Sequence, residues 1–345
     1  MRIAAPEAGR PRLALRAGFL LAALLASVTQ PVAAEPASSA VESKATATSE
    51  EASLFALPTT FDHIGRVVVP AMVNGKGPFR FIVDTGATYS TVSPGLVRAL
   101  GLKPAAVPGI VVNGITGTAQ VSAVTIDTLQ TGDLIVDGLV APVVWAPVMA
   151  GADGIFGAAG LTEKSLSVDF ERNRVRVARG VEPALRKAAM RIHAVRLTHG
   201  LITLESQVGR VRTLAVIDTG SERTLGNLAL RDALKLRNRT GAEALVTSVY
   251  GATEQVERGE LWIAPTISVD SMRINDVQVV YGDFHIFKVW GMEDKPAIIV
   301  GMDVLGTVGS LGIDFKNQDI YFTSSRANTT KFAPANELAN TVQRK

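Results

Sequence analysis

The chain contains the stretch FRFIVDTG at residues 79–86 and a matching stretch, TLAVIDTG, at residues 213–220. Each begins as an apolar run typical of a β-strand and ends in Asp-Thr-Gly. An ionised carboxylate at the end of a buried strand lowers stability unless it is paired, so a purely structural role suits Asp84 and Asp218 poorly. Because the two residues occupy equivalent positions, we expect their side chains to meet. The glycine permits a tight turn after each Asp, and the Thr hydroxyl can hydrogen-bond across to the other copy.

The match continues after the tripeptides, which indicates an internal duplication. Apolar residues recur in register, pairing Leu96 with Leu230, and their spacing predicts a short amphipathic helix in each copy. Ser93 and Asn227 are suited to cap the first turns of these helices, and Gly101 is suited to end the first helix.

Two further pairs of segments repeat. The tripeptide IFG at 155–157 matches IVG at 299–301, and SLSVDFERNRVRV from Ser165 matches SLGIDFKNQDIYF from Ser310. The longer pair reads as strand, polar turn and strand in each copy. The stretches outside the duplication lack apolar periodicity. We predict a signal peptide, a flexible leader, an N-terminal lobe, a C-terminal lobe and a disordered tail, at residues 1–34, 35–53, 54–180, 191–325 and 326–345.

The first 34 residues have the pattern of a secretory signal. Four arginines and an apolar run precede Val32-Ala33-Ala34, which matches a small-residue cleavage site. We therefore expect an exported protein, periplasmic or secreted, with no stable membrane span after signal cleavage. The same segment carries the excess behind the formal net charge of +3, so the rest of the chain gives no argument for a nucleic-acid partner.

The duplicated Asp-Thr-Gly, with IFG and IVG, resembles the pattern of retropepsin-like and pepsin-like aspartic peptidases. The resemblance covers about residues 55–322. It implies an all-β fold, mainly β with short helices, made of two pseudo-symmetric acid-protease β-barrel lobes in one chain. It also implies that Asp84 and Asp218 activate a water molecule that hydrolyses a peptide bond, with no metal or other cofactor. The residues that follow would support this pair: Thr85, Gly86, Thr219, Gly220 and Ser221.

The resemblance further implies a flap hairpin over the cleft in each lobe. The first candidate is VVNGITGTAQV, with Ile115, Thr116 and Gly117 at its tip, and the second is SVYGATEQV, centred on Tyr250 and Gly251. A pepsin flap carries a Tyr-Gly pair, which stands here in the second lobe and not the first. The sequence therefore leaves open which flap closes on a substrate.

The residue after each tripeptide differs between the copies. The hydroxyl of Ser221 is placed to hydrogen-bond Asp218, as is frequent in the family, whereas Ala87 has none to offer Asp84. A hydrogen bond to a carboxylate favours its charged form. We therefore expect Asp218 to be the more acidic partner and Asp84 to carry the shared proton.

Several other classes fit the sequence poorly. The absence of cysteine excludes disulfides and a thiol nucleophile, and the four histidines show no metallopeptidase spacing. No Gly-x-Ser-x-Gly elbow is present. Two alternatives remain: a non-catalytic peptide-binding protein that retains the acid-protease fold, and an enzyme that forms its site only as a dimer. The duplication already supplies both aspartates, so we expect a monomer acting on a peptide or protein substrate.

Overall fold

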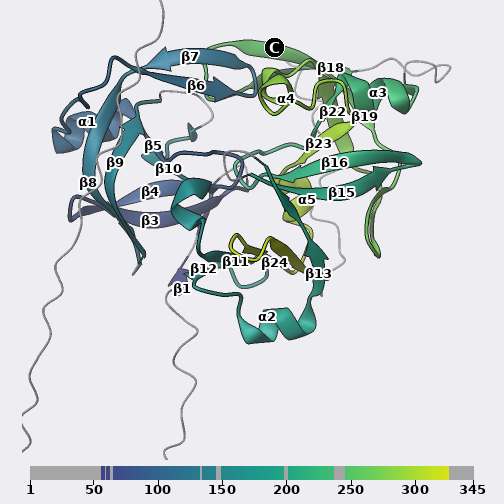
Figure 1. The fold of residues 1–345 in the computed structure, drawn as a ribbon, viewed down its shortest axis with the longest axis horizontal. Helices are drawn as coiled ribbons and strands as arrows, with labels where there is room; N and C mark the ends of the chain where they lie inside the picture. The colour runs from purple at the N-terminus through teal and green to yellow at the C-terminus, as the bar shows by residue number, and fades with distance from the viewer. Residues whose placement is uncertain are drawn as a thin grey trace, which may run out of the picture. The chain divides into compact units, whose positions relative to one another are not determined.

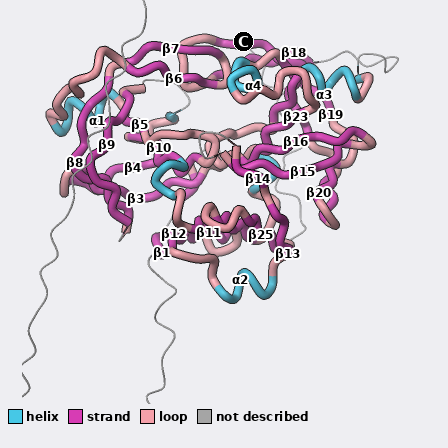
Figure 2. The backbone as a smooth tube through the Cα atoms, in the orientation of Figure 1, coloured by secondary structure: helices cyan, strands magenta, loops and turns pink. Residues whose placement is uncertain are grey.

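The computed structural model describes residues 56–58, 60–62, 65–132, 134–144, 149–197, 201–236 and 245–325, and the description below concerns these (Figure 1). Strands predominate among them and the helices are short, as Figure 2 shows. The mainly-β composition predicted from the sequence is therefore confirmed. The predicted signal peptide, leader and tail lie outside the described residues.

The first copy of the duplication forms a seven-stranded sheet in the order β5-β10-β4-β3-β8-β9, with β2 paired to β3. Its inner strands are apolar because both of their faces are covered: Phe81 and Val83 face the main core, and Ile82 faces a smaller cluster. The strands are β2 (Thr60–Phe61), β3 (Val67–Val73), β4 (Lys76–Asp84), β5 (Thr91–Val92), β8 (Ala123–Thr131), β9 (Leu134–Pro142) and β10 (Gly154–Gly157).

The second copy forms a ten-stranded sheet in the order β18-β19-β22-β17-β23-β16-β15-β20-β21, with β14 paired to β15. The duplication is visible in the strand pairing, because β16 runs parallel to β23 as β4 runs parallel to β10. The strands are β14 (Val195–Arg196), β15 (Ile202–Val208), β16 (Val211–Ile217), β17 (Leu225–Asn227), β18 (Leu245–Tyr250), β19 (Val256–Ile263), β20 (Ile267–Val269), β21 (Met272–Ile274), β22 (Gln278–Gly282) and β23 (Ala297–Val300).

A six-stranded sheet contains strands from both copies, in the order β1-β12-β11-β24-β25-β13. At its centre the repeated hairpins pair with each other, and Ser165 lies opposite Asp314 in the antiparallel register of β11 and β24. The two copies therefore share backbone hydrogen bonds. The strands are β1 (Ala56–Pro58), β11 (Ser165–Asp169), β12 (Arg174–Ala178), β13 (Met190–His193), β24 (Ser310–Asp314) and β25 (Asp319–Thr323).

The two predicted amphipathic helices are confirmed. In α1 (Pro94–Leu100) the Ser93 hydroxyl accepts a hydrogen bond from the Leu96 N–H at 3.1 Å, and Gly101 ends the helix at a φ of 61°. In α3 (Leu228–Ala233) the Asn227 side chain accepts from the Leu230 N–H at 2.9 Å. Both caps satisfy backbone N–H groups that a helix start otherwise leaves unpaired.

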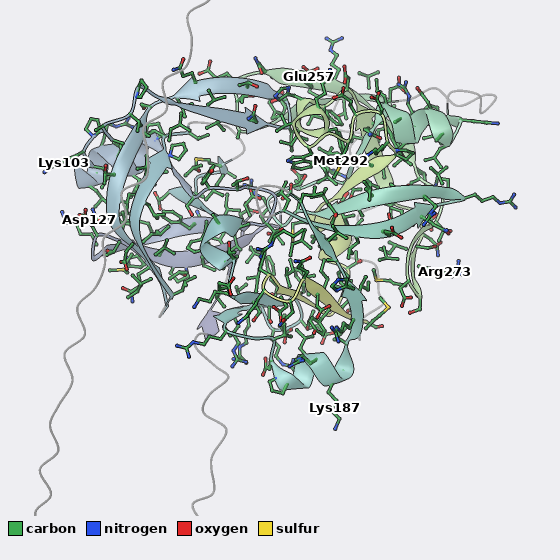
Figure 3. All side chains as sticks on the ribbon, in the orientation of Figure 1. Lys103, Asp127, Lys187, Glu257, Arg273 and Met292 are labelled. Atoms are coloured by element: carbon green, nitrogen blue, oxygen red, sulfur yellow. The ribbon has the colours of Figure 1, made fainter. Side chains whose placement is uncertain are left out.

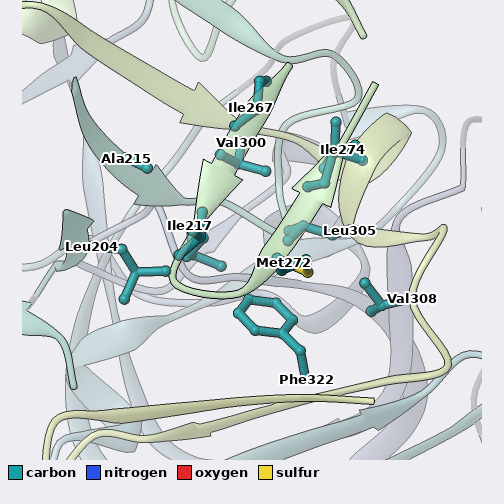
Figure 4. A pocket seen from close by; sticks show the side chains of 12 residues that line it. Leu204, Ala215, Ile217, Ile267, Met272, Ile274, Val300, Leu305, Val308 and Phe322 are labelled. Atoms are coloured by element: carbon teal, nitrogen blue, oxygen red, sulfur yellow. The ribbon is translucent and has the colours of Figure 1, made fainter. Parts of the chain in front are cut away.

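Most charged side chains point outward and apolar ones fill the interior, as Figure 3 shows for exposed Lys103 and Arg273 and for buried Met292. The core of the second lobe contains an apolar cavity of about 20 Å³ (Figure 4). Its walls include Leu204, Ile274 and Phe322. The cavity is too small for a ligand, and its apolar walls offer an ordered water no hydrogen-bond partner, so we regard it as a packing defect.

Candidate active site

The duplicated strands bring the two aspartates to equivalent places. Asp84 is the last residue of β4, and Asp218 directly follows β16. Gly157, at the end of β10, lies beside Asp84 in the parallel register, and the Asp218 N–H donates to the Val300 carbonyl at the end of β23 at 3.1 Å. The IFG and IVG strands therefore lie next to the aspartate strands.

The two threonines of the tripeptides connect the lobes. The Thr85 hydroxyl donates to the Ile217 carbonyl at 2.7 Å and accepts from the Thr219 N–H at 3.1 Å. In the mirrored contacts, the Thr219 hydroxyl donates to the Val83 carbonyl at 2.7 Å and accepts from the Thr85 N–H at 3.2 Å. Both side chains are buried. The prediction that each Thr hydroxyl bonds across to the other copy is confirmed.

The tripeptide glycines allow each carboxylate to lie against the opposite loop. A Cβ atom on Gly86 would stand 2.5 Å from Cγ of Asp218, and one on Gly220 would stand closer still to Cγ of Asp84. Neither glycine has a positive φ. The tight turn that the sequence suggested is thus not what requires glycine here; the close approach of the partner carboxylate is.

The two carboxylates are held by matching backbone contacts. Asp84 Oδ1 accepts from the N–H groups of Gly86 and Ala87 at 2.9 and 2.8 Å. Asp218 Oδ1 accepts from those of Gly220 and Ser221 at 2.8 and 3.1 Å. The carboxylates also hydrogen-bond each other. Two negative charges held this close are not both favourable, so this arrangement favours a pair that shares one proton.

Burial raises the pKa of both aspartates. The pKa of Asp218 lies well above its usual value because the negative charge of Asp84 adds to the effect of burial. At Asp84 the rise is opposed by hydrogen bonds and by the positive charge of Arg66. The two carboxyl groups therefore titrate as one coupled unit that shares a proton.

The side chain of Ser221 does not make the contact with Asp218 that was expected from the sequence. Its hydroxyl donates to the Arg223 carbonyl at 2.8 Å, and only its backbone N–H reaches Asp218. Ala87 offers Asp84 the same backbone contact. The prediction that Ser221 and Ala87 make the two aspartates differ is therefore wrong.

Arg66 supplies an asymmetry that sequence reasoning missed. It is 3% exposed and forms an ion pair with Asp62 at 2.8 Å. The register of β3 and β4 pairs Val68 with Ile82, so Arg66 stands two residues further on, level with Asp84. The corresponding residue of the second copy is Leu201. The sequence did carry a signal for this difference, because aligning the two copies places the charged Arg66 opposite the apolar Leu201.

Both predicted flaps are hairpins, and their tips meet. The first is formed by β6 (Ile110–Gly114) and β7 (Gly117–Val121), the second by β18 and β19. The hydroxyls of Thr116 and Thr253 lie 3.0 Å apart, and both residues are buried. A Cβ atom on Gly251 would stand 2.7 Å from the Thr116 hydroxyl, and one on Gly117 would overlap the Gln255 amide.

Of the remaining predicted flap residues, one packs against the second lobe and one is exposed to solvent. Ile115 packs against an apolar cluster of the second lobe. Tyr250 is 53% exposed and lies at the base of the second tip, paired with Val256. Sequence reasoning did not find Thr253, because a Thr in a turn carries no signal until the opposite tip is placed beside it.

The described part of the chain shows no group of three or more His, Asp or Glu side chains placed to hold a metal ion. Its helices are all too short or too polar to cross a bilayer.

Comparison with known proteins gives one match and one negative result. A family model described as aspartyl protease matches residues 69–159 and 204–304, which is more than half of the chain. Each matched region contains one Asp-Thr-Gly tripeptide. The predicted resemblance and the two-lobed acid-protease fold class are thereby confirmed. No curated protein matches the chain.

Proposed function

The chain belongs to the aspartyl protease family, and from this premise we propose that it is an aspartic endopeptidase whose catalytic residues are Asp84 and Asp218. The observation that carries the proposal is the hydrogen-bonded carboxylate pair, in which each Asp is oriented by two backbone N–H groups. Two carboxyl groups that share one proton provide a base and an acid in the same site.

The proposed chemistry follows from the shared proton. Charged Asp84 removes a proton from a water molecule between the two carboxyl groups, and the resulting hydroxide adds to the scissile carbonyl carbon. Protonated Asp218 gives its proton to the carbonyl oxygen, so a neutral tetrahedral diol forms. When the C–N bond breaks, Asp84 passes its new proton to the leaving nitrogen and Asp218 takes one back from the diol. The pair returns to its starting state without a covalent enzyme intermediate.

The substrate in this proposal is a peptide or an extended protein segment that binds between the flap tips and the aspartates. One chain supplies both aspartates and both flaps, which supports a monomer as the active form. The signal-like residues 1–34 support export to the periplasm or beyond the cell.

Digestion of a peptide library across acid and neutral pH tests the proposal. We expect internal cleavage that is inhibited by a peptide analogue with a hydroxyl at the scissile position, because a mimic of the tetrahedral state binds more tightly than a substrate. Chelators and serine-directed reagents should have no effect. Peptide binding without any cleavage over this pH range would contradict the proposal and favour a peptide-binding protein that retains the fold.

A further inference from the structure

A short helix of the second lobe lies against the flap of the first lobe. The helix is α4 (His285–Val289), and it contacts β6 and β7 (Figure 1). His285 Nε2 lies 2.8 Å from the Thr118 hydroxyl and 3.2 Å from the Asn113 side-chain oxygen. Thr118 and Asn113 face each other across the flap hairpin. One histidine of the second lobe thus contacts both strands of the first flap.

The donors and acceptors of this contact can be assigned. The Thr118 hydroxyl donates its only hydrogen to the Asn113 oxygen at 3.0 Å, so it can only accept from His285. The Asn113 oxygen is likewise an acceptor. His285 Nε2 therefore carries the ring hydrogen and shares this one hydrogen between the two acceptors, with the Thr118 oxygen the nearer.

The first flap has little other support from the backbone. Strands β6 and β7 form a two-stranded sheet of their own, outside the seven-stranded sheet of their lobe. The second flap differs, because β19 continues into the ten-stranded sheet through its pairing with β22. A hairpin without a sheet behind it is marginally stable, so side-chain contacts decide where it lies.

Those contacts come from the second lobe at three neighbouring places. Thr116 meets Thr253 at the tips, Ile115 packs against the apolar cluster that contains Phe284 and Phe287, and Thr118 and Asn113 meet His285. Phe284 and Phe287 flank His285 along the chain and are buried, which fixes the position of α4. His285 therefore projects from a rigid base onto a hairpin that is otherwise weakly held.

We propose that His285 is a positioning residue that latches the flap of the first lobe onto the second lobe and so sets how often the cleft is closed over the aspartates. It touches no reacting atom, and its effect on substrate rests on the peptidase activity proposed above. Closing a flap over a bound peptide uses the latch, so its loss should weaken substrate binding more than it slows the chemical step.

Spin labels can measure the flap position without any substrate. The natural chain has no cysteine, so Val111→Cys on β6 and Val246→Cys on β18 introduce two unique labelling sites, and both valines are exposed. Pulsed electron–electron double resonance between the two spin labels then gives the distribution of distances between the flaps. In this labelled background we compare His285→Leu and Thr118→Val with His285→Gln, whose amide can still donate. Lys288→Ala, on the exposed side of α4, is the matched control.

We expect His285→Leu and Thr118→Val to broaden the distribution toward longer distances, and the Gln and Lys288→Ala variants to keep the parent distribution. In peptide hydrolysis, loss of the latch should raise KM roughly fivefold, the factor that one net hydrogen bond is worth, with a smaller change in kcat. Combining His285→Leu with Thr118→Val should add little, because both remove the same contact.

The outcomes separate the latch from the peptidase proposal. An active parent whose flap distances and KM do not change in His285→Leu overturns the latch. A parent that cleaves no peptide but whose flaps separate in His285→Leu supports the latch and contradicts the peptidase proposal. If the Leu variant alone fails to fold, Thr118→Val decides, because it removes the acceptor on the flap and leaves α4 intact.

Discussion

Replacing Thr219 with Val should destabilise the protein strongly although the side chain keeps its shape. The Thr219 hydroxyl donates to the Val83 carbonyl and accepts from the Thr85 N–H, and the residue is fully buried. Val removes both contacts and leaves two buried backbone groups without a partner. Each unsatisfied group costs about 1 to 3 kcal/mol, so we expect the free energy of unfolding to fall by roughly 2 to 6 kcal/mol.

Thr219→Ser is the matched control, because it keeps the hydroxyl and removes only a methyl group. The loss of that methyl should cost about 1 kcal/mol. Denaturant titration of the parent and both variants measures the difference, with fluorescence and circular dichroism as two probes of whether unfolding is cooperative. If the Val variant is no less stable than the Ser variant, the hydroxyls do not hold the lobes together and our reasoning is wrong.

Three further predictions concern the carboxylate pair. Gly86→Ala should displace the Asp218 carboxylate, whose Cγ would stand 2.5 Å from the new Cβ, and lower kcat in steady-state assays while the protein stays folded; unchanged kcat would contradict the packing. Burial raises the pKa of Asp218, so this group stabilises the folded state fully below the usual Asp pKa, and that stability is lost as pH rises through the raised pKa. Asp218→Asn should therefore be more stable than the parent at neutral pH and equal to it in acid. Denaturant titration at each pH measures the difference. Replacing Arg66 with Leu and Asp62 with Asn together should raise the pKa of Asp84 and move the acid limb of the pH–activity profile upward; an unmoved limb would show that Arg66 does not act on the pair.

The features predicted correctly from the sequence are those with a local signal. Asp84 and Asp218 follow apolar strands in a repeated motif, and Ser93 and Asn227 stand where a helix cap is needed. The hairpins of the six-stranded sheet were visible as repeated strands. Their pairing with each other was not, because contacts between β11 and β24 join segments far apart in the sequence and nothing local specifies the partner.

The features that were missed or wrong depend on which partner a side chain selects. The Ser221 hydroxyl was expected to donate to Asp218, but it donates to the Arg223 carbonyl. Thr253 and His285 gain their roles only because the lobes bring them to the first flap. Spacing within one segment carries no information on such contacts between the lobes.

The most direct test of the central claim is peptide cleavage by Asp84→Asn and Asp218→Asn, prepared free of other peptidases and shown by circular dichroism to be folded. Each aspartate is one half of a proton-sharing pair, so we predict that either change abolishes cleavage and that the double variant is no worse than the single ones. Substantial turnover by either single variant would contradict the assignment of this pair as the catalytic site.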